Sequence, residues 1–210
     1  MSRVERCEYK GIRYLLFYPK NYVEGKKYPT LFHLHGAGSR GNDFALFEGS
    51  SSVVFDILKK EDSALSNGFV IIPQCYSDTW FDFFSDLIDF AKYMYSQPFV
   101  DQTQFNGSGV SMGGYGIYQV MQAVPELFHK ALICCGGGMY WNAGRICKIK
   151  YRIFHGAHDE VVYPEEAIRM YNRLKDNGAD VSLTIYDDCD HNCWEKTFNN
   201  YDNLTWLFSK

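Results

Sequence analysis

Short apolar runs alternate along the chain with longer segments in which apolar residues recur every three or four positions. The short runs predict strands, because they are rich in β-branched and aromatic residues; they are residues 13–18, 29–35, 69–73, 104–110, 131–135, 151–155 and 181–186. The longer segments predict helices at residues 53–60, 83–96, 114–124, 165–177 and 194–208. This alternation predicts an α/β fold with a mostly parallel central sheet of about seven or eight strands and helices on both faces.

Size and composition fit one globular domain spanning residues 1–210. Of the 210 residues, 46% are hydrophobic and 22% are charged, as in ordinary folded proteins. The formal net charge of -4 gives no reason to expect nucleic acid or an anionic membrane as a partner. No apolar run is long enough to cross a bilayer. The expected partner is therefore a small molecule, and the oligomeric state is left open.

The N-terminus and the cysteines favour a reducing compartment. Residues 1–8 contain no apolar signal-peptide segment, although a trimmed secreted chain would look the same. The seven cysteines are an odd number, which favours free thiols in a cytoplasm. Cys189 and Cys193 flank His191, but no second Cys/His pair with zinc-finger spacing accompanies them. The sequence therefore predicts no metal site and no cofactor, and it leaves open whether any cysteines pair.

Glycines crowd around one serine in the middle of the chain. Five of the residues between 107 and 116 are glycine, and residues 109–113 read Gly-Val-Ser-Met-Gly. This G-x-S-x-G pattern, between a predicted strand and a predicted helix, is typical of a nucleophile elbow. Gly109 and Gly113 would let strand and helix approach closely, so that Ser111 projects above the sheet near the positive helix N-terminus. A glycine-rich turn without chemistry is the alternative.

A serine nucleophile needs a base, and the base needs an acid that orients it. Asp159 lies just after one predicted strand and His191 just after the next, in the order Ser, Asp, His. The carboxyl ends of parallel strands share one edge of the sheet, where the chemistry of such folds lies. The sequence therefore predicts a catalytic triad of Ser111, Asp159 and His191. Glu160 is the main rival for the acid, and His155 is interpreted as a packed histidine.

Two backbone N–H groups are expected to stabilise the oxyanion of the tetrahedral intermediate. One is that of Met112, the residue after the nucleophile, and the other is that of Ala37, in the loop after the strand 29–35. Gly36 and Gly38 would permit unusual dihedral angles that turn the Ala37 N–H inward. A phosphate-binding loop is disfavoured, because the Lys-Ser/Thr pair that ends a P-loop is missing.

Five motifs together resemble the α/β-hydrolase superfamily, and within it the esterases related to feruloyl and acetyl-xylan esterases and to polyhydroxybutyrate depolymerases. They are HGAGSRGND at 35–43, PQC at 73–75 with Trp80 after it, GVSMGG at 109–114, HGAHDEVV at 155–162 and HNCW at 191–194. The similarity runs from about residue 11 to the end of the chain. This resemblance implies a serine esterase with the same triad and oxyanion donors. Along the chain, no insertion is long enough to form a large lid domain.

The expected activity is hydrolysis of short-chain or aromatic esters, of the acetyl or cinnamoyl/feruloyl type, through an acyl-enzyme. Trp80, Trp141 and Trp194 are candidates for substrate contact, because aromatic side chains in strand-end loops suit a flat acyl group. An acyl-thioesterase, a lysophospholipase and a small serine peptidase are open alternatives with the same triad. A non-catalytic binding protein is disfavoured, since it would have no need of all three triad residues.

Overall fold

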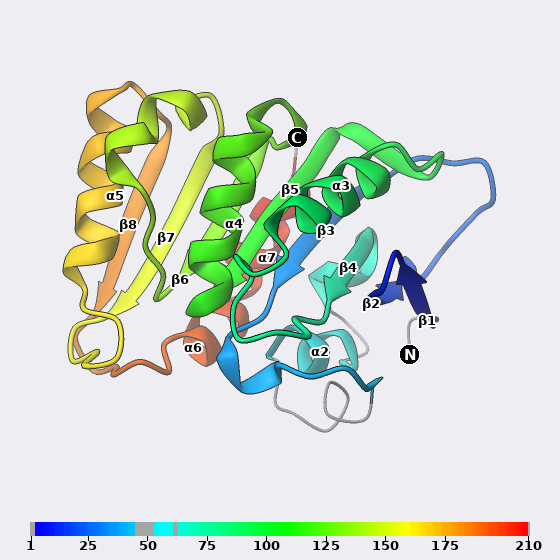
Figure 1. Ribbon diagram of the computed structural model, residues 1–210, viewed down its shortest axis with the longest axis horizontal. Helices are drawn as coiled ribbons and strands as arrows, with labels where there is room; N and C mark the ends of the chain where they lie inside the picture. The colour runs from blue at the N-terminus through cyan, green and yellow to red at the C-terminus, as the bar shows by residue number, and fades with distance from the viewer. Residues whose placement is uncertain (1–2, 45–52, 61–62, 210) are drawn as a thin grey trace.

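A computed structural model describes residues 3–44, 53–60 and 63–209 (Figure 1). These residues form an eight-stranded sheet with the strand order β1-β2-β4-β3-β5-β6-β7-β8. β2 pairs antiparallel with β1 and β4, and all other neighbouring strands are parallel. The strands are β1 (Val4–Tyr9), β2 (Ile12–Phe17), β3 (Tyr28–Leu34), β4 (Phe69–Pro73), β5 (Val100–Val110), β6 (Lys130–Cys134), β7 (Lys150–Gly156) and β8 (Val181–Tyr186).

Helices cover both faces of the sheet. On the face toward the viewer in Figure 1 lie α3 (Phe84–Tyr95), α4 (Met112–Ala123) and α5 (Glu165–Asp176). The apolar side chains of α2 (Val53–Leu58), α6 (Trp194–Phe198) and α7 (Tyr201–Phe208) belong to a second buried cluster, on the opposite face of the strands. Short 3-10 turns join these elements; they are η1 (Ala37–Ser39), η2 (Ala64–Asn67), η3 (Pro125–Leu127) and η4 (Tyr140–Ile146).

The predicted fold class is confirmed, with two differences in the elements. The edge strand β1 was not predicted, because its residues alternate between exposed and half-buried and include several charges. The predicted helix 194–208 is two helices, because the Asn200 side chain accepts hydrogen bonds from Asp202 N and Asn203 N and so begins a new helix. In the described part of the chain no large lid domain is inserted.

The parallel strands bring their carboxyl ends to one edge of the sheet. The arrowheads of β3, β7 and β8 point to the lower edge in Figure 1. The ends of four parallel strands are each followed by one of the predicted site residues: Ala37 after β3, Ser111 after β5, Asp159 after β7 and His191 after β8. The fold therefore gathers residues that are far apart in the sequence.

Gly113 is the point of closest approach between the elbow and β3. A Cβ atom added there would lie 2.0 Å from the Leu34 carbonyl oxygen, and one added at Gly109 would lie 2.2 Å from that of Gly113. Because backbone atoms cannot move aside cheaply, we expect Gly113→Ala to lower the free energy of unfolding by about 3 kcal/mol or more. Urea denaturation of this variant measures the loss.

Gly38→Ala is the matched control for this prediction. A Cβ at Gly38 would meet no atom within 4 Å, so the same substitution should leave the free energy of unfolding within about 1 kcal/mol of the original. Equal stabilities of the two variants would contradict the argument from close approach.

Candidate active site

Ser111 occupies a sharp turn between β5 and α4. Its backbone has φ 54° and ψ -121°, a conformation that side chains rarely tolerate. The turn is held on both sides, because Ser111 N–H donates to Cys134 O at 2.9 Å and Gly114 N–H donates to Ser111 O at 2.8 Å. Strain of this kind at a strand-to-helix junction is the geometry of a nucleophile elbow.

A chain of hydrogen bonds joins the three predicted triad residues. Ser111 Oγ lies 2.9 Å from His191 Nε2, and His191 Nδ1 lies 2.7 Å from Asp159 Oδ2. A neutral imidazole with its proton on Nδ1 donates to the carboxylate and leaves Nε2 free to accept the serine proton. The three side chains come from three different loops, and the structure places them in the order that general-base activation of a serine requires.

The Asp159 carboxylate is buried and receives several hydrogen bonds. Val161 N–H and Val162 N–H each donate to Oδ1 at 2.9 Å. Oδ2 faces His191 and also His155, whose Nε2 lies 3.1 Å away. Since a buried charge is costly unless it is hydrogen bonded, these donors stabilise the ionised acid.

The structure distinguishes Asp159 from its neighbours Glu160 and His155. Glu160 is exposed, whereas Asp159 is 2% exposed and bonded to His191, so the geometry favours Asp159. His155 is buried, and its Nε2 lies 2.8 Å from Val162 O. Its contact with Asp159 was not predicted, although both residues stand at the carboxyl end of β7, His155 within the strand and Asp159 just after it.

Ala37 and Met112, the predicted oxyanion donors, are the first residues of η1 and α4. The N–H groups at the start of a helix have no acceptor within it, so both are available for a ligand. Ala37 lines the same cavity as Ser111. The donor role of both residues stays a prediction.

The expected dihedral role of Gly36 and Gly38 is wrong. Gly36 has φ -74° and ψ 175°, and neither glycine has a positive φ. Gly36 instead lies close to the elbow, because a Cβ added there would be 3.5 Å from Ser111 Cβ. Contacts of this length are ordinary van der Waals contacts, so space alone does not require glycine at this position.

Trp80 was predicted to contact substrate, and this prediction is wrong. Its side chain has 0% exposed surface, so no ligand in the cavity reaches it. The indole Nε1–H donates to His35 O at 3.1 Å, and the ring packs against the His35 ring with centroids 4.9 Å apart. His35 in turn donates from Nδ1 to Gly36 O at 2.7 Å and accepts Cys75 N–H on Nε2 at 3.0 Å. Trp80 therefore supports the segment that leads into the loop with Ala37.

The other two tryptophans lie in different surroundings. Trp141 is 63% exposed, packs edge-on against Tyr140 and does not line the cavity described below. Trp194 is half-buried, lines that cavity and meets the His191 ring edge-on at 5.3 Å between centroids. Substrate contact stays a prediction for both, and the geometry favours Trp194.

A cavity of about 390 Å³ opens beside Ser111 and His191. This volume is near the lower end of the range of small-molecule sites, roughly 300 to 1,000 Å³. Its apolar wall is formed by Val53, Val110, Val161 and Trp194, and the other lining residues are His33, His35, Gly36, Ala37, Gly38 and Ser39. The site thus combines a small apolar chamber with a serine and a histidine at its wall.

Two buried histidines, His33 in β3 and His35 directly after it, make stability depend on pH. Burial lowers the pKa of His33 to about 3 and that of His35 to about 4, from 6.5. In the unfolded chain both take up protons near pH 6.5, so the unfolded state binds more protons below that pH. Stability from these groups is therefore full above pH 6.5 and is lost as the pH falls toward 4. In this window each histidine should lower the free energy of unfolding by about 1.4 kcal/mol for each unit by which the pH falls.

Urea denaturation at pH 7, 6 and 5 tests this dependence. His33→Asn should lose less stability between pH 7 and pH 5 than the unchanged protein, because one of the two histidines no longer titrates. His129→Gln is the matched control, since His129 is exposed, and it should follow the unchanged protein. The same slope in all three proteins would contradict the prediction.

Comparison with known proteins places the chain in a family. Residues 76–143 and 148–207, more than half of the chain, match the prolyl oligopeptidase family. The chain belongs to this family. A search of curated proteins found no match.

Many solved structures are similar to the whole chain. A thermostable esterase has a TM-score of 0.82 and 28% identity, covering 99% of this chain and 62% of its own, so the chain spans less than two thirds of that protein. A feruloyl esterase module from Clostridium thermocellum, complexed with sinapinate, has a TM-score of 0.76 and 15% identity over 99% of this chain and 88% of its own. Acylaminoacyl peptidase from Pyrococcus horikoshii has a TM-score of 0.71 and 15% identity, and the match covers 99% of this chain and 41% of the peptidase chain.

These matches establish the family and the fold. The chain has the α/β-hydrolase fold, and the likeness to serine esterases stated from the sequence is confirmed. The matches at 15% identity show the fold alone. Among the described helices, none is both long and apolar enough to cross a membrane.

Proposed function

We propose that this member of the prolyl oligopeptidase family hydrolyses small carboxylic esters of short-chain or aromatic acids. The observation that carries the proposal is the continuous hydrogen-bond chain from Ser111 through His191 to Asp159, at the wall of a small apolar cavity. A serine with this support is activated as a nucleophile, and the adjoining chamber has room for an acyl group.

The geometry supports a two-step mechanism. Ser111 Oγ attacks the ester carbonyl carbon while His191 Nε2 accepts the serine proton, and Asp159 stabilises the imidazolium that forms. The N–H groups of Ala37 and Met112 would donate to the oxyanion of the tetrahedral intermediate. The C–O bond to the alcohol then breaks, and His191 returns the proton to the leaving oxygen. Water, activated by the same histidine, releases the acid and restores Ser111.

The walls of the cavity support a small acyl group. Val110 and Val53 are buried, Val161 is exposed at the rim, and Trp194 offers a flat half-buried surface. Each methylene placed against such a wall gains about 0.8 kcal/mol, until the chain outgrows the chamber. Acetyl, butyryl and single-ring aromatic acyl groups fit this description better than long alkyl chains.

Peptide hydrolysis is the second candidate. Membership of the prolyl oligopeptidase family favours it, and an activated serine attacks amides and esters by the same steps. The two candidates differ in the leaving group, since an amine must be protonated as it departs. Acyl-thioesters are a third substrate class with the same chemistry.

A substrate panel distinguishes these candidates. We expect high kcat/KM for p-nitrophenyl acetate, p-nitrophenyl butyrate and methyl ferulate, and at least about 100-fold lower values for p-nitrophenyl palmitate, palmitoyl-CoA and N-acetylalanine p-nitroanilide. Higher kcat/KM for the anilide would favour the peptidase. Higher values for either palmitoyl substrate would favour the lipid or thioester alternative and overturn the proposal.

A further inference from the structure

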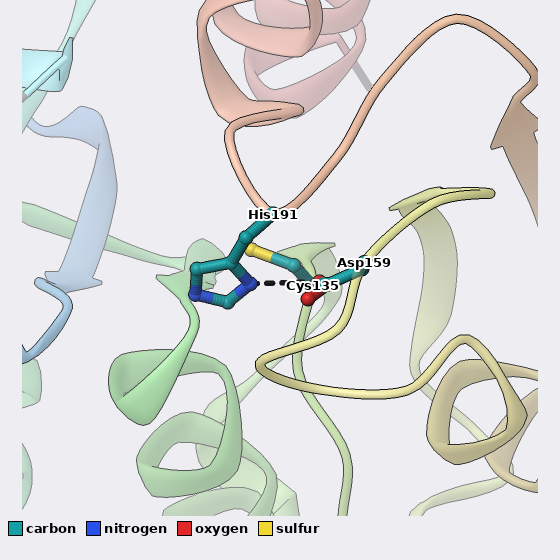
Figure 2. A group of neighbouring side chains, drawn as sticks. All are labelled: Cys135, Asp159 and His191. Carbon is teal, nitrogen blue, oxygen red and sulfur yellow. Dashed lines mark hydrogen bonds and ion pairs between the residues drawn. The ribbon is translucent and has the colours of Figure 1, made fainter.

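Three side chains that can bind a metal ion lie close together at the ends of neighbouring strands. Cys135, Asp159 and His191 follow β6, β7 and β8, which are neighbours in the sheet. Their sulfur, carboxylate oxygen and ring nitrogen lie within 4.8 Å of one another. Figure 2 shows the three side chains and the hydrogen bond between His191 and Asp159. Asp159 and His191 belong to the proposed hydrolytic machinery, whereas Cys135 has no task in it.

Cys135 is held in this place by an uncommon backbone conformation. Its φ is 40°, in the left-handed region that residues other than glycine seldom adopt. Its N–H donates to Phe154 O at 2.9 Å, which ties the residue to the end of β7. The side chain is buried, and its thiol contacts that of Cys193. The conformation therefore fixes a thiol beside the His191–Asp159 pair.

We propose that Cys135, Asp159 and His191 form an inhibitory binding site for a thiophilic divalent cation of the Zn²⁺ type. Thiolate, imidazole and carboxylate are the ligands that Zn²⁺ takes, and three protein ligands leave a fourth position for water. Bond lengths of about 2.3 Å to sulfur and about 2.1 Å to nitrogen and oxygen place tetrahedral ligand atoms roughly 3.4 to 3.6 Å apart. The three atoms are already within 4.8 Å. The 2.7 Å bond from His191 to Asp159 has to open, and the contact of His155 Nε2 with Asp159 Oδ2 at 3.1 Å has to adjust.

The charges in the site balance when the cation is bound. Burial raises the pKa of the Cys135 thiol, so a lone thiolate is disfavoured there. A divalent cation compensates both the thiolate and the Asp159 carboxylate, which leaves a neutral buried cluster. Binding expels the thiol proton, because the thiolate is the form that coordinates the cation.

Binding at this site would stop the reaction through the tautomer of His191. The nitrogen that faces Asp159 is Nδ1, and coordination there moves the imidazole proton to Nε2. Nε2 faces Ser111 at 2.9 Å and must be unprotonated to act as the base. The cation therefore removes the base without touching the nucleophile. This inhibition rests on the proposed function, whereas the binding itself does not.

Metal binding is tested first in the Ser111→Ala variant, which keeps all three ligands and has no nucleophile. Titration with Co²⁺ and with Cd²⁺ should produce a sulfur-to-metal charge-transfer band in the ultraviolet at one equivalent. The band should be lost when Cys135→Ala or Cys135→Ser is added, with circular dichroism confirming that each variant is folded. Cys147→Ala removes a half-buried cysteine that is not part of this group; it is the control and should keep the band. A band that survives in both Cys135 variants, or never forms, overturns the site.

Inhibition is tested separately on p-nitrophenyl acetate hydrolysis. Zn²⁺ should inhibit the protein reversibly, with full recovery on chelation by EDTA. Within each variant the rate with Zn²⁺ is divided by the rate without it. Cys135→Ala should need at least about tenfold more Zn²⁺ for half inhibition. Unchanged sensitivity would overturn the inhibitory role, and absence of any esterase activity would contradict the proposed function while the Co²⁺ titration still tests the site.

Discussion

Ser111→Ala is expected to abolish ester hydrolysis while the protein stays folded. Removing Oγ leaves no atom to form the acyl-enzyme, so only substrate binding and the oxyanion donors remain. Loss of a triad member commonly costs a factor of about 10³ to 10⁶ in kcat. KM should change little, because Oγ contributes almost nothing to binding the ground state. Steady-state hydrolysis of p-nitrophenyl acetate measures both constants.

Two measurements make this result specific to the nucleophile. A fluorophosphonate probe should label the unchanged protein on one peptide containing Ser111, and the variant should take up no label. The free energy of unfolding, measured by urea denaturation, should stay within about 1 kcal/mol of the original value. The hydrogen bond that is lost joins Oγ to His191, which is half-buried. Labelling of Ser111→Ala, or turnover near that of the unchanged protein, would show that the nucleophile lies elsewhere.

The inner strands of the sheet were predicted from their continuous apolar residues, and the edge strand β8 from its β-branched and aromatic residues. β4 and β6 are buried along their whole length, so their apolar runs stand out against the flanking turns. β1 is paired on one side only, and its charged, half-exposed residues carry no such signal. The break between α6 and α7 depends on one side chain, Asn200, which caps the second helix inside a continuous apolar pattern.

The hydrogen-bonded triad could be anticipated because strand ends of a parallel sheet meet at one edge. Knowing which residue follows each strand is then enough to place Ser111, Asp159 and His191 near one another. The packing of the loops could not be anticipated in this way. Trp80 lies in a polar stretch of sequence, yet it turns inward because the His35 carbonyl accepts its N–H and Gly116 leaves room for its ring.

Cys135 shows a further limit of the sequence. It is the last residue of the predicted strand 131–135, which comes directly before the predicted strand that leads to Asp159. The same reasoning about strand ends would therefore have placed it near the site. A cysteine after an apolar run is most often a packing residue, and the sequence carries no sign of its left-handed backbone. Only the structure shows that its thiol lies beside the side chains of Asp159 and His191.

Asp159→Asn is expected to lower kcat by a factor of about 10² to 10⁴ without unfolding the protein. The carboxylate now accepts hydrogen bonds on both oxygens, from Val161 N–H and Val162 N–H on Oδ1 and from His191 on Oδ2. An amide can keep its oxygen toward the two backbone donors, but its NH₂ group then faces His191 Nδ1. To accept a hydrogen bond from this NH₂ group, the imidazole must present an unprotonated Nδ1 and carry its proton on Nε2. Nε2 then cannot accept the proton of Ser111.

Glu160→Gln is the matched control for this prediction, because it makes the same change in an exposed neighbour. Its kcat should stay within about twofold of the original value, and so should its stability. Both variants are compared on p-nitrophenyl acetate at pH 7, with kcat and KM determined separately. The tautomer argument requires that Asp159→Asn lose kcat while KM changes little, because the substrate does not touch the acid. A larger loss in Glu160→Gln than in Asp159→Asn would mean that the loop after β7 presents the other carboxylate to His191 during the reaction.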